Sequence, residues 1–535
     1  MSNITFASLS QFSVLPTLAQ VSLVFISLLA FTWTRRTWKG PYPPGPRGLP
    51  LLGNTLQIPP DRQWLKWAEW KAQYGDVIRI SILGTPAIIL SSARAATDLL
   101  ESRGNIYSDR PAATMAGELV GWSRGLGYAQ ASHNPRFREL RRLFHEFMGP
   151  RACAKPALLR IQERQNNRLL QKLLFDPDNF DAHARDCTSS LILVLAYGYP
   201  SHLGDPLGLV KIAHDAMEGF SVASEPGRWW VDYFPALQYL PSWLPGASFQ
   251  REAQRMRADL DKLFDVPFQF VKREIETGHP HPSFLLSYLQ EKNGEETPEE
   301  EELVQAFGTA LYSGGAETTP SALTSFILAM ALNPEVQDRA QREIDSLLST
   351  SNSSQGSVPI PTRLPTFEDK GDLPYVSAIV KEVWRWNPSV PLGLPHVVTQ
   401  EDHYRGYTIE KGSIVWANVW AILHDEEIFP DPFAFRPERY LTGDDVPDST
   451  VTAAFGFGRR ICPGMHIAEN SVFIAVVTIL CMFRISKSVD EQGSTIEPVV
   501  EYDGFISHPR PFKCKIELRR EGLEGLLDSE VVVEE

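Results

Sequence analysis

The sequence is poor in cysteine and contains no paired cysteine motif. Only five cysteines occur among 535 residues, namely Cys153, Cys187, Cys462, Cys481 and Cys514, and no two of them form a C-x-x-C pair. This scarcity argues against a disulfide framework and a structural zinc site, and it favours a reducing compartment. Cys462 alone lies within a distinctive local motif.

Positive charge, internal repeats and linkers are scarce as well. Lysine and arginine total 51 against 65 acidic residues, which gives a formal net charge of -14 and argues against nucleic acid as a partner. No internal repeat is evident, and no linker-like break divides the chain after its first fifty residues. The 13 tryptophans and 43% hydrophobic residues can fill one large core. We therefore expect one large domain after the N-terminal segment.

A single long uncharged run stands near the N-terminus. Residues 14–33 are long enough as a helix to cross the roughly 30 Å of a bilayer core. Three basic residues follow: Arg35, Arg36 and Lys39. By the positive-inside rule they place the rest of the chain in the cytosol, so residues 1–39 are predicted to be a membrane anchor. A cleaved signal peptide and a core helix are the alternatives, but the run has no basic region before it and no amphipathic pattern.

The next segments predict a helical domain with a small β region. Residues 40–54 are rich in proline and form a stiff hinge, and residues 62–75 have apolar side chains at helical spacing. Residues 76–90 alternate in polarity around Gly84-Thr85, which predicts a β-hairpin. Helical periodicity then dominates to about residue 387. Residues 349–362 are expected to form a flexible loop, and the acidic residues 521–535 a solvated tail.

One predicted helix is strong at its ends and weak in its middle. Thr297 and Glu300 form a capping box around Pro298, and the next stop signal is Asn333-Pro334, so about 35 residues of helix are expected. The sequence SGGAETTP at 313–320 opposes helix formation in the centre. This pattern indicates a local distortion with a function. From the periodicity alone, a kink that accommodates a bulky neighbour explains the weak centre equally well.

The sequence FGFGRRICPG at 455–464 surrounds Cys462 with glycine and arginine. The residues after Gly464 predict a helix, so Cys462 precedes a helix N-terminus, where negative charge is stabilised. Arg459 and Arg460 add positive charge. A nucleophilic cysteine would require a base such as His466, but no third orienting group is apparent. An inert buried cysteine would explain neither the glycines nor the arginines.

This stretch resembles the haem-binding loop of the cytochrome P-450 superfamily, F-x-x-G-x-R-x-C-x-G. All five fixed positions match: Phe455, Gly458, Arg460, Cys462 and Gly464. The resemblance implies that the Cys462 thiolate is the axial ligand of haem iron and that Arg460 neutralises a propionate. It also implies a mainly helical haem domain over residues 55–520.

Two further motifs fit the same family in the expected order. Glu382 and Arg385 resemble its E-x-x-R pair, and Arg439 resembles the third member of a buried network that braces the haem loop. The sequence GGAETT at 314–319 is similar to the distal-helix motif, which implies that Glu317 and Thr318 are an acid–alcohol pair that delivers protons.

The resemblance is imperfect near residues 136–142. Phe137 occupies a position where the family usually carries tryptophan. The absence of the tryptophan indole N–H removes one hydrogen bond, worth about 1 kcal/mol. Arg141 is the expected propionate partner there. His396 resembles another propionate contact, although a surface or core histidine is the alternative. Pro320 is not a motif position and has no explanation beyond helix bending.

The family resemblance implies a membrane-bound monooxygenase. The reaction would insert one oxygen atom from O2 into a C–H bond of a small apolar terpenoid, polyketide or aromatic substrate. Stretches such as HDEEIFPDPFAFRPERY look like fungal enzymes of secondary metabolism similar to those labelled O-methylsterigmatocystin oxidoreductase-like. The expected pocket residues, which an ordinary core would explain equally well, are Phe307, Ala310, Leu311, Gly314, Val390, Leu392, Leu394, Phe505 and Ile506.

The chain carries no flavin or nicotinamide fingerprint, so its electrons must come from another protein. The resemblance implies NADPH–cytochrome P-450 reductase as donor and the endoplasmic reticulum membrane as location, with the catalytic domain facing the cytosol. The basic run 136–142 could dock this donor, and a solvated helix face explains the same residues. Two other functions stay open: a haem-thiolate isomerase or dehydratase that needs no reductase, and a non-catalytic membrane haem protein.

Overall fold

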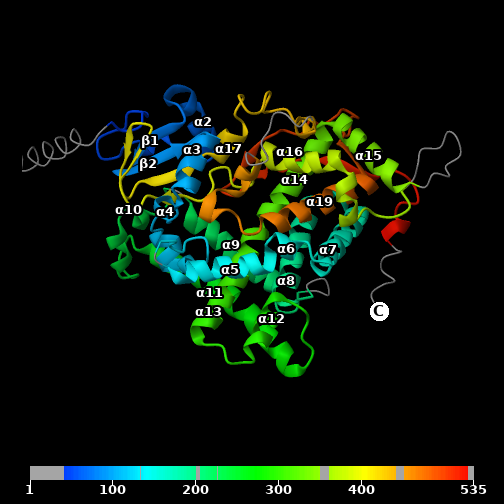
Figure 1. Cartoon of the computed structure of the whole chain (residues 1–535), viewed down its shortest axis with the longest axis horizontal. Helices are drawn as coiled ribbons and strands as arrows, with labels where there is room; N and C mark the ends of the chain where they lie inside the picture. Colours follow the sequence, from blue (N-terminus) through cyan, green and yellow to red (C-terminus); the bar gives the residue numbers. More distant parts are fainter. Residues whose placement is uncertain are drawn as a thin grey trace, which may run out of the picture.

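The computed structural model describes residues 41–132, 134–200, 205–225, 227–349, 361–441 and 451–527. The predicted anchor, residues 1–39, and the last part of the tail, residues 528–535, lie outside this part of the chain. Helices form most of the described residues, and short strands gather mainly at one end of the molecule (Figure 1). The predicted mainly helical fold with a small β region is confirmed for the described residues.

The helices, in chain order, are α2 (Gln63–Tyr74), α3 (Ala93–Ala96), α4 (Gly104–Tyr107), α5 (Pro135–Met148), α6 (Pro150–Cys153), α7 (Pro156–Phe175), α8 (Phe180–Tyr197), α9 (Leu209–Ser224), α10 (Trp230–Tyr233), α11 (Ser248–Thr277), α12 (Phe284–Lys292), α13 (Pro298–Gly315), α14 (Thr318–Leu332), α15 (Pro334–Leu348), α16 (Pro374–Trp386), α17 (Val419–Leu423) and α19 (Met465–Met482). The strands are β1 (Val77–Ile82), β2 (Thr85–Leu90), β3 (His396–Val397), β4 (Asp402–Tyr404), β5 (Tyr407–Ile409), β6 (Ile414–Ala417), β7 (Phe483–Lys487), β8 (Tyr502–Asp503), β9 (His508–Pro509) and β10 (Cys514–Leu518).

The largest sheet contains four strands in the order β1-β2-β6-β3. Strands β1 and β2 form the predicted antiparallel hairpin, whose turn at Gly84 has φ +88°, a conformation that glycine adopts without strain. Strand β6 pairs parallel with β2 and antiparallel with β3. The predicted helix over residues 62–75 is confirmed as α2, which lies beside this sheet (Figure 1).

The predicted 35-residue helix is wrong in one respect, because it is two helices. Helix α13 ends at Gly315 and α14 begins at Thr318, with Glu317 as its N-cap. Pro320 therefore lies in the first turn of α14, where a missing N–H costs no helical hydrogen bond. This position accounts for the proline that the motif did not explain. The capping box at Thr297 is present as predicted.

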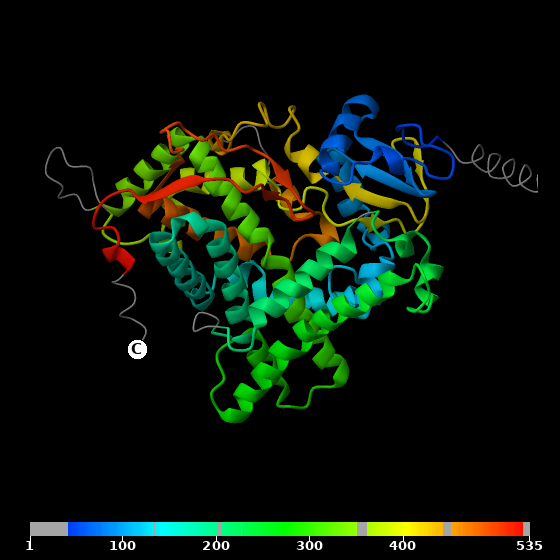
Figure 2. The same cartoon turned by 180° about the vertical axis from the view of Figure 1, so that it is seen from behind.

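The two halves of this interrupted helix belong to different hydrophobic clusters. Buried residues of α13 pack with α5, α8, α9, α11 and α12 in one cluster. Buried residues of α14 pack with α7, α15, α16, α19 and β7 in a second cluster. Figure 2 shows the second group toward the end of the molecule opposite the four-stranded sheet, with the red strand β10 running across it. The break at 316–317 thus lies where the two cores meet.

Helix α19 was predicted from the residues after Gly464 and is confirmed. Within the described ranges it is also the only helix long and apolar enough to cross a membrane, but most of it is buried inside the protein. Its length and apolarity are those of a central core helix. The predicted solvated tail is wrong at its start, because Leu523 and Leu527 are buried and Leu527 packs on the core.

Candidate active site

The loop that carries Cys462 is held in shape by its own backbone. The Cys462 N–H donates to the Phe455 carbonyl at 2.7 Å, which closes the loop. Gly458 has φ +53°, and a Cβ at this position would lie 2.5 Å from the Leu100 carbonyl oxygen. Only glycine satisfies both the turn and the close packing. The Phe455 ring packs on Trp384 of α16, with ring centroids 4.9 Å apart.

The Cys462 side chain is exposed and lines a cavity, and the protein around it is dense enough to bury the thiol electrostatically. Burial raises the pKa of the thiol, while the Gly464 N–H and Arg141 partly oppose that shift. The sequence predicted that the loop alone stabilises the thiolate. This stabilisation is smaller than the cost of burying the negative charge. A metal cation bound to the sulfur would supply the missing stabilisation, because a coordinating thiol loses its proton outright.

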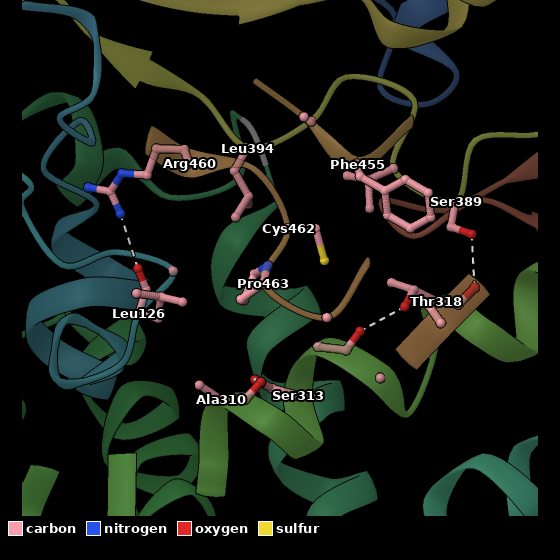
Figure 3. Close-up of a pocket in the computed structure, with 18 of the residues that line it drawn as sticks. Leu126, Ala310, Ser313, Thr318, Ser389, Leu394, Phe455, Arg460, Cys462 and Pro463 are labelled. Atoms are coloured by element: carbon pink, nitrogen blue, oxygen red, sulfur yellow. Dashed lines mark hydrogen bonds between the residues drawn. The ribbon is translucent and has the colours of Figure 1, made fainter. Parts of the chain in front are cut away.

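The cavity, of 350 Å³, extends from Cys462 to the break between α13 and α14. Figure 3 shows the Cys462 sulfur pointing into it beside Phe455 and Pro463, with Ser313 and Thr318 on the opposite wall. The lining is mostly apolar. A Cβ on Gly314 would meet nothing within 4 Å, so the distal wall leaves an open groove at the helix break.

Basic side chains line the same cavity, and no acidic side chain is among the described residues that line it. The basic side chains are Arg110, Arg141, Arg459, Arg460 and His396. Burial and the Arg460 charge hold the pKa of Arg110 well below its ordinary value, and burial lowers that of Arg460 to about 10. His396 is buried, and burial followed by the charge of Arg110 holds its pKa well below 6.5. An anion in the cavity would stabilise the buried arginines, and His396 could donate a hydrogen bond to it, so a flat macrocycle with two carboxylates fits this lining.

Arg460 and Arg141 donate their hydrogen bonds to backbone carbonyls. Arg460 donates to the carbonyls of Ser108 and Leu126, at 2.7 and 3.1 Å, and its guanidinium lies 4.2 Å from the centre of the Phe137 ring. Arg141 donates to the Ile461 carbonyl at 2.7 Å, one residue before Cys462. The phenylalanine that replaces tryptophan thus supports Arg460 through a cation–π contact.

Arg110 is a site residue that the sequence did not reveal. It donates to the carbonyls of Leu394, Pro395 and Gly127, and it is 6% exposed. His396 Nδ1 donates to the Tyr107 carbonyl at 2.7 Å, close to Arg110 in the chain. No local pattern marks Arg110, because its partners lie as many as 285 residues away. A buried arginine next to cavity residues becomes visible only in three dimensions.

The predicted acid–alcohol pair divides between two environments. Thr318 lines the cavity, and its Oγ1 donates to the Gly314 carbonyl at 2.7 Å (Figure 3). Glu317 is not among the lining residues, and its carboxylate pairs with Arg185 of α8 and approaches His508 of β9. Burial opposes ionisation of Glu317, but His508 and Arg185 outweigh it and hold its pKa below the ordinary value.

The predicted Glu–Arg–Arg network is present around one fully buried carboxylate. Arg385 donates to both oxygens of Glu382, at 2.7 and 2.9 Å, and Arg439 donates to Oε1 at 3.3 Å. The Arg436 N–H and the Tyr440 hydroxyl complete the shell of Glu382. Arg385 also donates to the Leu423 carbonyl. The network therefore ties α16 to the segment before the Cys462 loop.

The predicted pocket residues lie mainly where expected. Those that line the cavity are Ala310, Leu311, Gly314, Val390, Leu392, Leu394, Phe505 and Ile506. Phe307 does not line it and is corrected here. Its ring is fully buried against Phe144 and Phe284, with ring centroids 4.4 and 3.9 Å apart. Phe307 shares a helix face with Ala310 and Leu311 but lies one turn farther from the helix break, where α5 and α12 cover it.

Comparisons with known proteins agree with this geometry. The sequence model of the family described as Cytochrome P450 matches residues 43–516. Cytochrome P450 monooxygenase 208 of Postia placenta is 41% identical over 519 residues, which cover 96% of this chain and 98% of the relative. Cytochrome P450 monooxygenase claR of Ampulloclitocybe clavipes is 40% identical, with 91% and 88% covered. Tryptamine 4-monooxygenase of Psilocybe cyanescens is 39% identical, with 92% and 96% covered.

These matches span the cysteine loop, the interrupted distal helix and the Glu382 network alike. The relatives are fungal monooxygenases, and their alignment extends over nearly the whole chain. Together with the helical fold, they show that the chain belongs to the cytochrome P450 family and is a monooxygenase.

Proposed function

We propose that this protein binds haem through the Cys462 thiolate and inserts one oxygen atom from O2 into a C–H bond of a small apolar substrate. The observation that carries the proposal is the cavity that joins Cys462 to the break between α13 and α14. Haem, when bound, supplies the iron that activates O2 after two electrons arrive. Arg110, Arg141, Arg460 and His396 would hold its propionates, because they line the cavity and no acidic side chain lines it with them.

Thr318 and Glu317 would move protons to the reacting oxygen. Thr318 lines the cavity, whereas Glu317, one residue earlier, lies outside the lining and pairs with Arg185 of α8. A hydroxyl can accept a proton on one side while it donates on the other. The carboxylate therefore serves as the supplier and the hydroxyl as the final donor.

The substrate class follows from the lining. Phenylalanine, leucine, isoleucine and valine side chains dominate the walls, including Phe220, Val390 and Phe505. Such a surface favours an aromatic, terpenoid or polyketide skeleton. One relative is named for tryptamine, an aromatic amine, which agrees with that class.

NADPH–cytochrome P-450 reductase is the proposed electron donor, with α5 as a docking element. Arg138 is exposed and has no ion-pair partner among the described residues, whereas Arg142 pairs with Glu139 and Glu146. Arg138 is therefore the better contact. Charge reversal at Arg138 should slow reductase-supported reduction, and an unchanged rate would remove the docking role.

The endoplasmic reticulum membrane is the proposed location. Beyond the predicted anchor, exposed apolar side chains gather on two segments at the same end of the molecule in both views (Figures 1 and 2). They are Leu49, Leu51 and Leu56 near the hinge, and Trp230, Phe234, Tyr239 and Trp243 around α10. Amphipathic aromatics of this kind suit a membrane interface. Protein lacking residues 1–39 should still float with liposomes, and less so when Trp243 and Tyr239 become serine.

The function is tested with the reduced protein under carbon monoxide. Wild type should show the strongly red-shifted Soret band of a thiolate-ligated carbonyl, and Cys462→Ser should lack it. Wild type with reductase, NADPH and a panel of aromatic and terpenoid compounds should then yield hydroxylated products. Conversion that needs no reductase would support the isomerase alternative, and haem binding without any conversion the non-catalytic one.

A further inference from the structure

His508 lies behind the distal helix in a charged cluster that the family motifs do not include. Its Nε2 atom is 3.3 Å from Glu317 Oε2, and it is buried without a well-aligned hydrogen bond among the described residues. Its Nδ1 atom is 3.1 Å from Arg185 Nη2. Arg185 also pairs with the same Glu317 oxygen. Histidine and arginine therefore converge on one carboxylate from β9 and α8.

The contact with Arg185 fixes the protonation form of His508. A guanidinium can only donate, so Nδ1 of the imidazole must accept and carries no proton. A neutral ring then has its proton on Nε2, the atom that faces Glu317. The arrangement thus presents an N–H bond to the carboxylate that supplies Thr318.

A buried polar network holds His508 in this place. The preceding residue, Ser507, accepts through its carbonyl from Ser321 Oγ at 2.6 Å and from Asn387 Nδ2 at 3.2 Å. The Ser507 N–H donates to the Ser389 carbonyl at 2.8 Å, and Ser389 Oγ donates to the Thr318 carbonyl at 2.9 Å. One set of hydrogen bonds therefore positions both the imidazole and Thr318 (Figure 3 shows the Ser389 bond).

The cluster also reaches solvent. The side chains of His508, Glu317 and Arg185 are 18%, 22% and 35% exposed, so the group bridges the exterior and the distal wall. The charged groups that surround the imidazole come from every neighbouring element: Arg185 and Asp181 on α8, Glu317 at α14, Asp503 on β8, and Arg510 after β9.

We propose that His508 passes protons from solvent to Glu317, as the entry point of the route that ends at Thr318. This inference rests on the proposed role of Glu317 and Thr318. In each transfer the Nε2–H bond breaks and a bond from that proton to Glu317 Oε2 forms, while a hydronium ion of the solvent gives a proton to Nδ1 and leaves as water. The incoming proton displaces the hydrogen bond that Arg185 donates to Nδ1. Arg185 stays in place because Asp181 holds it through a 3.0 Å ion pair. Exchange with water restores the Nε2–H form, and no electron moves.

The tautomer is the first test, because it does not depend on turnover. Full-length protein labelled with ¹⁵N-histidine is examined by NMR, and the signal missing from His508→Gln identifies the residue. We expect the Nε2–H form with Nδ1 as acceptor, and loss of that preference in Arg185→Gln. An Nδ1–H signal in the wild type would overturn the inference.

The second test compares three variants with wild type during NADPH oxidation under saturating reductase, without added substrate. His508→Gln should lower the rate on the order of 10-fold, less than the roughly 100-fold expected for a group acting at the reacting atom itself. The loss should grow from acidic to alkaline pH, and the solvent isotope effect should increase. The exposed His403→Gln is the matched control and should match wild type.

Glu317→Gln separates the two levels of the argument. If it slows oxidation while His508→Gln does not, His508 is not the proton entry and this inference fails. If Glu317→Gln itself matches wild type, the acid–alcohol route of the proposed function fails, and the inference with it. Carbon monoxide spectra of all variants should stay identical, since none of these side chains lines the haem loop.

Discussion

Two adjacent glycines at the end of α13 allow a sharp test of the packing above the haem site. Gly314 and Gly315 are neighbours in the same helix, so alanine should gain about 0.5–1 kcal/mol of helix stability at either position. A Cβ on Gly314 would meet nothing within 4 Å. A Cβ on Gly315 would lie 2.4 Å from Ile192 Cδ1, which is closer than real contacts allow.

The expected energies follow from those distances. Gly314→Ala should raise the free energy of unfolding by about 0.5–1 kcal/mol. Gly315→Ala should lower it by about 1 kcal/mol, because overpacking costs roughly 1–3 kcal/mol against the helical gain. Ile192→Val alone should cost about 1 kcal/mol. The valine lacks Cδ1, so the nearest remaining atom, Cγ1, would lie 3.4 Å from the added Cβ. The double variant Gly315→Ala/Ile192→Val should therefore have a free energy of unfolding close to that of wild type.

Chemical denaturation of the four proteins, followed by circular dichroism, measures the coupling. An additive pair would lose about 2 kcal/mol, whereas a double variant close to wild type gives an interaction energy of about 2 kcal/mol. Gly314→Ala combined with Ile192→Val is the control pair and should be additive. Equal behaviour of the two glycine positions would refute the argument that α8 presses on α13 at this point.

Three further outcomes are expected. Glu382→Gln should lower the free energy of unfolding by about 3–5 kcal/mol in denaturation experiments, because it leaves buried arginines unpaired, whereas Glu69→Gln in an exposed pair should change it by about 0.5 kcal/mol or less. Arg110→Gln should release haem to apomyoglobin about 10-fold faster, and retention equal to wild type would contradict the propionate role. Burial raises the pKa of Asp232 from 3.8 to about 6, so folding favours its protonated form, and that contribution is lost as pH rises through 6. The free energy of unfolding of Asp232→Asn should therefore rise by about 3 kcal/mol relative to that of wild type between about pH 4 and pH 7, as measured by thermal unfolding. A difference that does not change with pH would contradict the raised pKa.

Features with local causes were predictable from the sequence. The Cys462 loop follows from glycines whose positive φ is required within a few residues, and the β1–β2 hairpin follows from Gly84 and alternating polarity. The Thr297 capping box marks the start of α13 for the same reason. The Glu382–Arg385 pair is one helical turn apart, so its contact is fixed by the helix itself.

Features with distant causes were not predictable. The end of α13 at Gly315 depends on which turn places Pro320 without loss of a hydrogen bond, and periodicity continues across that point. Arg110 and His508 acquire their partners from segments hundreds of residues away. A signal for His508 did exist, because it follows Ile506, a predicted pocket residue, by two positions. Phe307 was misplaced because one sequence alone does not show which neighbouring helices cover each turn of a helix.

The meeting of two hydrophobic cores at the helix break has a consequence for how this enzyme can diversify. The walls that would contact substrate, such as Phe220 and Ile192, belong to or pack on the α13 core. The Phe455 end of the cysteine loop and the central α19 pack on the α14 core. Substitutions in separate cores act nearly additively on stability. Substitutions in the α13 core can therefore change the cavity walls proposed to contact substrate without lowering the stability of the core that supports the Cys462 loop. The α13 core is thus the natural target for directed evolution of new specificities.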